Sequence, residues 1–529
     1  MCMGTLINVI TSAVVIESVS TEDKRGDLGS MKCCCWILIS LLFAIDKAIG
    51  AKQPNVLIIL TDDQDVVLDG MHPMRNVKNL IGSAGATFEN AYTSSPLCCP
   101  SRASILTGKY AHNHLTFNNS MSGGCYGSHW RAKDEKHTLA TILGNAGYST
   151  FYAGKYLNAY HGLEVPPGWQ HFFGLHGNSV YYNFTLREND HNVSYNNVYL
   201  TDLLRDKTLE FLDQRDKEEP FLAFVAPPAP HQPFTPADRH RGAFNNTKAK
   251  RTPSFNKVDK EKHWLLATSK EIPEETLSLM DSYFEKRWES LLAVDELVAS
   301  VIHKLQQSGE LENTYVIYTS DNGYHIGQFA QPFDKRQPYE TDIQVPLLIR
   351  GPSIKPGVTV TTPTLLIDLL PTILEWIHLP LDPQMDGQSL HPFLVNADSY
   401  DAAADMYYNR GLLVQHKGEG NLRTYRSECP MWKPEDRLAE CTRESACHCQ
   451  DSWNNTYACV RNFAYGINHL YCEFQDDEDF AEFYDMYDDP QQLRNMAKQM
   501  LAIERALYSL ALKNLTKCAG AASCSIHVF

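Results

Sequence analysis

The amino-acid sequence predicts an α/β fold, built on a large, mostly parallel central sheet flanked by helices. Four apolar runs, rich in β-branched or aromatic residues, each lead into polar residues: Asn55–Leu60, Tyr148–Ala153, Phe221–Ala226 and Tyr315–Thr319. Near-continuous apolar strands of this length are typical of parallel sheets that are covered on both faces. Helical periodicity separates the runs, and alternation of strands with helices indicates an α/β protein.

The remaining elements follow from the same patterns. Apolar positions recur at helical spacing in Thr138–Asn145 and Met280–Gln306, which predicts two helices. Val345–Arg350 predicts a further strand, and Thr364–Ile377 predicts a further helix. We expect this α/β domain to occupy residues 51–395.

The C-terminal part of the chain has a different character. Six cysteines fall between Cys429 and Cys472, and acidic residues crowd positions 475–489. We therefore predict a smaller, disulfide-rich domain over residues 396–529. Cys447-His448-Cys449 could bind a metal, but disulfides are favoured in an oxidising compartment.

The N-terminus predicts secretion. Residues 33–45 form an apolar run that follows Met31-Lys32 and precedes small residues from Ala48 to Ala51. This pattern is typical of a signal peptide within a 1–50 leader, and a retained signal anchor is the alternative. The run is shorter than the ~20 residues of a membrane helix. No later segment predicts a span, so we expect none in the mature chain.

Composition and net charge limit the functions that the chain can have. The chain has 529 residues, 43% hydrophobic and 21% charged, which excludes a disordered or fibrous protein. The net charge of −16 argues against a nucleic-acid partner. The 20 histidines could bring this charge to at most +4, so an acidic compartment would suit an anionic substrate.

Secretion is consistent with the cysteines and the glycosylation motifs. Eleven cysteines remain after the leader, and an odd number leaves one thiol unpaired or put to another use. N-x-S/T sequons, which are weak signals on their own, occur at Asn118, Asn183, Asn192, Asn245, Asn454 and Asn514.

Polar residues follow the four predicted strands, at Asp62-Asp63, Gly154-Lys155, His231 and Asp321-Asn322-Gly323. The carboxyl ends of strands in an open α/β sheet border one crevice, so we expect these groups to converge. Asp62, Asp63, Asp321 and Asn322 offer oxygen ligands, which favours Ca²⁺ or Mg²⁺. The alternative for each motif alone is a plain turn or helix cap.

The segment Ser94–Tyr110 carries the most distinctive motif, Cys98-Cys99-Pro100-Ser101-Arg102. It predicts the start of a helix, where free N–H groups and the Arg102 guanidinium suit a tetrahedral oxyanion. A thiol phosphatase would need a longer loop between cysteine and arginine. The alternative is a pair of buried or disulfide-bonded cysteines before an ordinary helix.

These residues resemble the type I sulfatases, in which C-x-P-S-R is followed by L-T-G-K. The resemblance covers nearly the whole mature chain, from Asp62-Asp63 to Glu482–Ala497. It implies an alkaline-phosphatase-like sulfatase fold with a smaller C-terminal α+β domain. It also implies that Cys98 is converted to formylglycine, leaving ten cysteines, and that Ca²⁺ is bound by the four oxygen ligands and position 98.

Within this family the chain is most similar to the lysosomal N-acetylglucosamine-6-sulfatases, through segments such as AGKYLNAY and DNGYHIGQFAQPFDKRQPYE. The resemblance implies removal of 6-O-sulfate from N-acetylglucosamine in heparan and keratan sulfate, in the lysosome. An extracellular endo-acting glucosamine 6-O-sulfatase is an alternative, but the chain lacks the long basic insertion of that group. A silent glycan-binding homologue and a phosphomonoesterase or phosphonate hydrolase are the others.

The resemblance also assigns roles to single residues. Arg102, Lys155 and Lys335 would hold the sulfate oxygens. His231 would give a proton to the departing sugar hydroxyl, and His325 would border the site. The partners implied are a sulfated glycosaminoglycan, the formylglycine-generating enzyme and, as a candidate assembly, a homodimer.

The chain departs from the family at one position. The motif lysine is normally followed two residues later by His, but Leu157 stands there, with Asn158 next. His112, His114 and His325 are the candidates to take the role of that His. We also expect Cys99 and Cys125 to pair.

Overall fold

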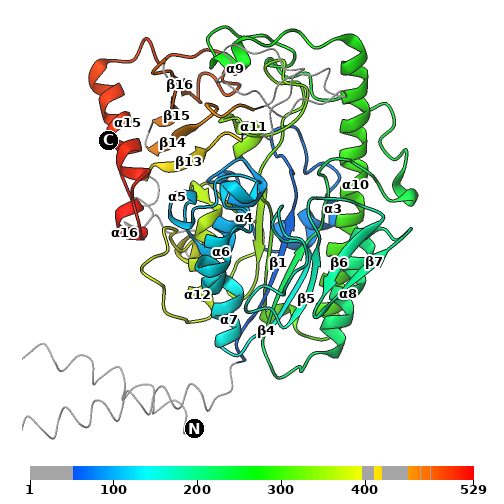
Figure 1. The fold of residues 1–529 in the computed structure, drawn as a ribbon. Coiled ribbons are helices and arrows are strands. Elements are labelled where there is room, and N and C mark those ends of the chain that lie inside the picture. The colour runs from blue at the N-terminus through cyan, green and yellow to red at the C-terminus, as the bar shows by residue number, and fades with distance from the viewer. Residues whose placement is uncertain (1–51, 396–409, 420–450, 465, 477, 529) are drawn as a thin grey trace, which may run out of the picture. The chain divides into compact units, whose positions relative to one another are not determined.

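The computed structural model describes residues 52–395, 410–419, 451–464, 466–476 and 478–528 (Figure 1). By their backbone contacts, the described residues from Gln53 onward form one compact unit. The signal-peptide prediction and Cys447-His448-Cys449 lie outside the described residues. Among the described residues, no helix combines the length and the apolar character that crossing a membrane requires.

A ten-stranded sheet forms the centre, in the order β11-β2-β10-β9-β1-β8-β4-β5-β6-β7. The five strands from β9 to β5 are parallel, whereas β10, β2, β6 and β7 add antiparallel pairings at both sides. The sheet is therefore mixed, with the predicted parallel strands at its middle. The strands are β1 (Asn55–Thr61), β2 (Ala86–Phe88), β4 (Ser149–Lys155), β5 (His171–Leu175), β6 (Phe184–Glu188), β7 (His191–Tyr195), β8 (Phe221–Ala226), β9 (Thr314–Ser320), β10 (Leu347–Arg350) and β11 (Val358–Val360).

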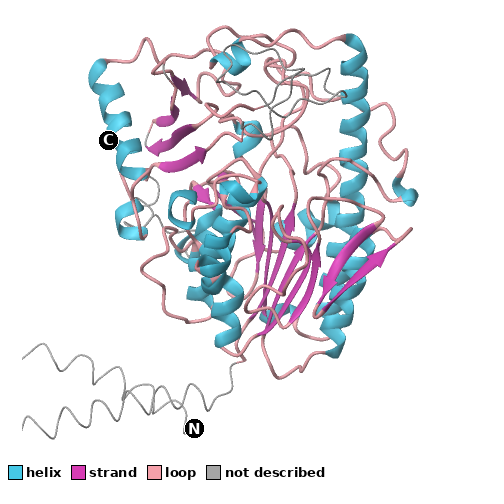
Figure 2. Cartoon of the chain, in the orientation of Figure 1, coloured by secondary structure: helices cyan, strands magenta, loops and turns pink. Residues whose placement is uncertain are grey.

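Helices cover both faces of the sheet (Figure 2). Strand β1 shows why, because its side chains alternate between two buried clusters. Val56, Ile58 and Leu60 join the cluster under α4 (Cys98–Thr107), α7 (Leu139–Asn145) and α12 (Leu369–Trp376). Leu57 and Ile59 join the cluster under α8 (Leu200–Gln214) and α10 (Glu274–Gln307). Each fully buried Leu or Ile stabilises the fold by about 1.5–3 kcal/mol.

The predicted helix over Thr364–Ile377 begins later than expected. Thr364 and Leu365 form the short strand β12, which pairs with β3 (Ala91–Tyr92), and α12 starts at Leu369 after a 3-10 turn. The Asp368 carboxylate accepts the Leu365 amide at 2.8 Å, which holds this extended start. The apolar periodicity alone cannot reveal such a pairing.

A second sheet contains β13 (Leu412–His416), β14 (Tyr457–Ala464), β15 (Ile467–Phe474) and β16 (Ala481–Asp485), all antiparallel. Helix α15 (Ala502–Leu515) packs against it, and the disulfide Cys459–Cys472 joins β14 to β15. Its buried side chains share one cluster with Tyr92, Phe329 and Tyr339 of the preceding part. The boundary at residues 395/396 stays a prediction.

Shorter elements complete the description. The helices are α3 (Arg75–Val77), α5 (Ala111–His114), α6 (Ser128–Ala132), α9 (Trp264–Ala267), α11 (Glu340–Ile343), α13 (His391–Val395) and α16 (Ala521–Cys524). Single π or 3-10 turns lie at Lys78–Gly82, Met121–Gly123, Asp134–His137, Asp238–His240, Leu311–Asn313 and Leu366–Asp368.

Candidate active site

Four neighbouring strands of the central sheet bring the predicted polar residues together. Thr61 and Ser320 are paired at the ends of β1 and β9, so Asp62-Asp63 and Asp321-Asn322 emerge side by side. Lys155 ends β4, and β8 leads through a proline-rich turn to His231. The expected convergence of the strand ends is confirmed.

Cys98 is the first residue of α4 and is fully buried. Its Sγ lies 3.6 Å from Asp62 Oδ1 and 3.8 Å from Asp63 Oδ1. Burial raises the pKa of the Cys98 thiol well above its usual range, although Lys155 and Lys335 oppose this. A thiol kept neutral is a poor nucleophile, which agrees with setting aside a thiol phosphatase.

Cys98 is also the free cysteine among the described residues, since Cys99 is bonded to Cys125 and Cys518 to Cys524. The expected Cys99–Cys125 disulfide is confirmed. It ties the second residue of the helix to the loop after α5.

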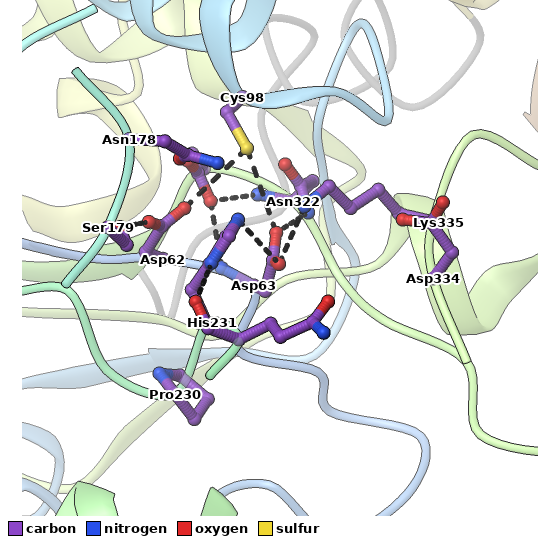
Figure 3. Close-up of polar contacts among 12 residues, drawn as sticks. Asp62, Asp63, Cys98, Asn178, Ser179, Pro230, His231, Asn322, Asp334 and Lys335 are labelled. Atoms are coloured by element: carbon purple, nitrogen blue, oxygen red, sulfur yellow. Dashed lines mark hydrogen bonds and ion pairs between the residues drawn. The ribbon is translucent and has the colours of Figure 1, made fainter. Parts of the chain in front are cut away.

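The oxygen donors form one buried cluster (Figure 3). Asp63 N donates to Asp321 Oδ1 at 3.1 Å, and Asn322 Nδ2 donates to Asp63 Oδ1 at 2.7 Å. Asp62, Asp63, Cys98 and His231 place one donor atom each within 4.8 Å of one another. This cluster could hold a cation.

The donor chemistry fits a hard cation. Asp62, Asp63 and Asp321 bury three carboxylates, and the Asn322 Oδ1 is buried without a hydrogen-bond partner among the described residues. Burial raises the pKa of Asp321 to about 6, with Arg102 opposing the rise. A divalent cation would neutralise this concentration of charge and accept the orphaned amide oxygen, as oxygen-rich sites do.

Basic side chains neutralise the carboxylates directly. Lys155 Nζ lies 2.8 Å from Asp62 Oδ2, and Lys335 Nζ lies 2.6 Å from Asp63 Oδ2. Burial disfavours the charged form of Asp62, but Lys155 and its basic neighbours prevail and hold its pKa well below the usual range. Both lysines are buried, so the site offers fixed positive charge beside Cys98.

Arg102 faces the carboxylates. Its Nε donates to Asp321 Oδ2 at 2.8 Å and its Nη1 to the Lys155 carbonyl at 2.7 Å. Its Nη2 is buried, 3.5 Å from Asp62 Oδ1, and has no hydrogen bond to the residues that the structure describes. Arg102 thus fixes Asp321, and one donor is left toward the cluster.

His231 lies at the edge of the cluster, with its Nδ1 2.5 Å from the Gln232 carbonyl. Nδ1 therefore carries a hydrogen, and Nε2 faces Asp63 Oδ2 at 3.7 Å. Burial lowers the pKa of His231 to about 4, against the charges of Asp62 and Asp63.

The three histidines considered as replacements for the family His differ in their surroundings. His114 is held by Ser104 Oγ and the Thr116 amide, and burial lowers its pKa to about 3. His112 contacts Gln415 and the Cys518 carbonyl. His325 Nδ1 lies 3.0 Å from both Asp342 oxygens, and its Nε2 is buried with no hydrogen-bond partner in the described part of the chain. Only His325, of these three, keeps a ring nitrogen free for a ligand.

Two residues of the site escaped the sequence analysis. Ser179 Oγ hydrogen-bonds to Asp62 Oδ2 from the loop between β5 and β6. Arg287, fully buried on α10, donates from Nη2 to the Asp63 carbonyl and to Asp65 Oδ1, both at 2.8 Å. Neither residue belongs to a recognisable motif, because its role depends on contacts between distant segments.

The comparisons with known proteins agree with this geometry. A family model described as Sulfatase matches residues 54–379. The chain is 45% identical over 515 residues to the N-acetylglucosamine-6-sulfatase of Homo sapiens, covering 94% of this chain and 91% of that protein. It is 40% identical to the Extracellular sulfatase SULF-1 homolog of Drosophila melanogaster, over 65% of this chain and 32% of that protein.

A solved structure described as a complex with its substrate D-glucosamine-2-N,6-O-disulfate has the same fold. Its TM-score is 0.70 at 24% identity, and the match covers 88% of this chain and 98% of that chain. On the family match and the human relative, the chain belongs to the sulfatase family.

Proposed function

We propose that this sulfatase removes the 6-O-sulfate of N-acetylglucosamine 6-sulfate units in heparan sulfate and keratan sulfate. The observation that carries the proposal is the buried cluster around Cys98, in which oxygen donors and lysines surround a neutral thiol. The 45% identity to a human N-acetylglucosamine-6-sulfatase over most of both chains supports the substrate.

In this proposal Asp62, Asp63, Asp321 and Asn322 hold Ca²⁺, together with position 98 once Cys98 has become formylglycine. Formylglycine would supply a hydrated aldehyde as nucleophile, and the cation would draw charge from the sulfate oxygens. The formylglycine-generating enzyme is the partner required during secretion, and the lysosome is the destination.

The basic residues bind and orient the sulfate. Lys155 and Lys335 lie within hydrogen-bonding distance of the carboxylates beside Cys98, so small side-chain movements bring both ammonium groups onto sulfate oxygens. Arg102 orients Asp321, favours its ionised form against the effect of burial, and offers its remaining Nη2. Fixed charges in a site without water stabilise the developing negative charge more than in solution.

His231 is the residue that would protonate the departing sugar oxygen. Its Nδ1 hydrogen bond to the Gln232 carbonyl fixes the ring, so Nε2 is the nitrogen that would take up a proton when the anionic substrate is bound and then donate it. His325, oriented by Asp342, is the candidate to contact the nucleophile or a sugar hydroxyl through Nε2.

Release of inorganic sulfate from N-acetylglucosamine 6-sulfate, measured from pH 4 to 8, tests the proposal. We expect turnover in the acidic range and none in Cys98→Ala. A matched phosphate ester is the control, and preference for phosphate would contradict the proposal. Activity confined to neutral pH would argue against the lysosome, and cleavage only inside long chains would favour the endo-acting alternative.

A further inference from the structure

The residue after Lys335 is held in an unusual conformation by the C-terminal part of the chain. Arg336 is 6% exposed and has φ of 86°, a region that residues other than glycine rarely adopt. Its amide donates to the Pro96 carbonyl at 3.2 Å, two residues before Cys98. The Lys335 loop is therefore attached to the segment that leads into the nucleophile.

The Arg336 side chain points to residues beyond position 410. Its Nη2 and Nε donate to Glu419 Oε2 at 2.9 and 3.2 Å, and Asp451 Oδ2 lies 3.8 Å from Nε. The Arg336 carbonyl accepts the Tyr457 hydroxyl at 3.0 Å. Asp334, two residues before Arg336, also forms an ion pair with the guanidinium. Residues of the C-terminal part of the chain thus hold both the side chain and the backbone of Arg336.

Glu419 connects this loop to the start of the nucleophile helix. Its second oxygen, Oε1, accepts the Asn119 amide at 2.8 Å. The Asn119 Oδ1 in turn accepts the Cys99 amide at 2.9 Å, one of the amides that the first turn of α4 leaves free. One carboxylate, 7% exposed, therefore links the segments that carry Lys335 and Cys98.

We infer that Glu419 is a positioning residue for the active site, which sets the distance between Lys335 and position 98 through Arg336 and Asn119. The inference rests on the proposed function, because it takes Lys335 as a ligand of the sulfate. Arg336 suits this task because its planar fork is rigid, whereas a lysine would offer one flexible ammonium group. The C-terminal part of the chain would then complete the site.

The test compares two variants with a matched control. Glu419→Gln removes the charge that orients Arg336, and Arg336→Lys keeps the charge but loses the fork. Arg461→Lys is the control, because Arg461 forms a buried ion pair with Glu340 Oε1, at 2.9 Å, between the same two parts of the chain. Folding is followed by circular dichroism and thermal unfolding of the full chain.

The decisive readout is the dissociation constant of inorganic sulfate, measured by calorimetry without turnover. If Lys335 is displaced, its charge-assisted contact with sulfate is lost. We therefore expect about a 10-fold weaker affinity for sulfate in Glu419→Gln and Arg336→Lys. A displacement of Lys335 by ~1 Å predicts about a 100-fold lower kcat/KM on the sugar sulfate. Arg461→Lys is expected to lower the Tm and leave the sulfate affinity unchanged.

If the Glu419–Arg336 ion pair only stabilised the fold, the variants would behave differently. Fewer molecules would fold, kcat would fall in proportion, and sulfate affinity would equal that of the wild type; this would overturn the inference. Wild-type protein that binds no sulfate would overturn it as well. Wild-type protein that binds sulfate but does not cleave the sugar ester would contradict the proposed function alone, since the affinities of the variants still decide the role of Glu419.

Discussion

We expect Glu135 to make the free energy of unfolding depend on pH, and Glu135→Gln tests this prediction. The side chain is 2% exposed, and its Oε1 accepts Trp130 Nε1 at 3.1 Å and the Tyr156 hydroxyl at 3.0 Å. Burial raises the pKa of Glu135 to about 7, although both hydrogen bonds oppose the rise. An unfolded glutamate has a pKa of about 4.3.

Proton binding by Glu135 determines whether the free energy of unfolding rises or falls with pH. Between pH ~4.3 and ~7 the folded chain holds a proton on Glu135 that the unfolded chain has lost, so the free energy of unfolding falls as pH rises. One pKa unit corresponds to about 1.4 kcal/mol, so the loss across this interval is on the order of 3 kcal/mol. Glutamine keeps an oxygen for both hydrogen bonds and carries no charge. Glu135→Gln should therefore be as stable as the wild type at pH 4.5 and more stable by about 3 kcal/mol at pH 7.5.

Urea unfolding of both proteins at pH 4.5, 6.0 and 7.5 measures this difference. Glu89→Gln, at an exposed position, is the control and should change little at any pH. The prediction would be wrong if the free energies of unfolding of wild type and Glu135→Gln changed in parallel with pH, or if the variant were less stable at pH 7.5.

Three further predictions concern the site and the surface. Arg287→Met should lower kcat/KM about 100-fold, because the Asp63 carbonyl loses its hydrogen bond from Arg287. It should also lower the free energy of unfolding by about 3–5 kcal/mol, because the buried Asp65 loses its ion pair with Arg287. Unchanged kinetics would contradict the role of Arg287 in positioning Asp63. Chelation of Ca²⁺ should lower the Tm, readdition should restore it, and Asp63→Asn should shift the Ca²⁺ midpoint upward, as ligand linkage requires; a Tm that ignores chelation in both proteins would contradict the cation site. Asn192 is exposed on β7, an edge strand of the ten-stranded sheet, and Asn183 is exposed directly before the neighbouring strand β6, so glycans attached there would block pairing with other chains. Mass mapping of secreted protein should find both asparagines modified, and an unmodified Asn192 would contradict this prediction.

The centre of the fold could be predicted because its strands are long and apolar. β1, β4, β8 and β9 each fill a continuous buried run, and their polar ends point to the site. At one side of the sheet, β10 lies within the predicted strand Val345–Arg350, but its neighbour β2 and the edge strand β11 could not be predicted. Each of these two strands has three residues, too few for any periodicity.

The site residues also differ in whether they follow a predicted strand. Asp62, Asp63, Asp321 and Asn322 follow strands and could be found from that position. Lys335 lies in a loop and was identified through the family resemblance alone.

Arg287 and Glu419 could not be found in either way. Arg287 stands among charged neighbours on a long helix, where a solvent-facing role is the ordinary expectation. Its contact with Asp63 spans 224 residues of sequence, and the contact of Glu419 with Asn119 spans 300. Such pairs are set by the tertiary fold.

The conversion of Cys98 is tested by the mass of the peptide containing position 98, taken from protein that releases sulfate from N-acetylglucosamine 6-sulfate. We expect the mass of an aldehyde in place of the Cys98 thiol in the active fraction. An unmodified thiol at position 98 in fully active protein would contradict it.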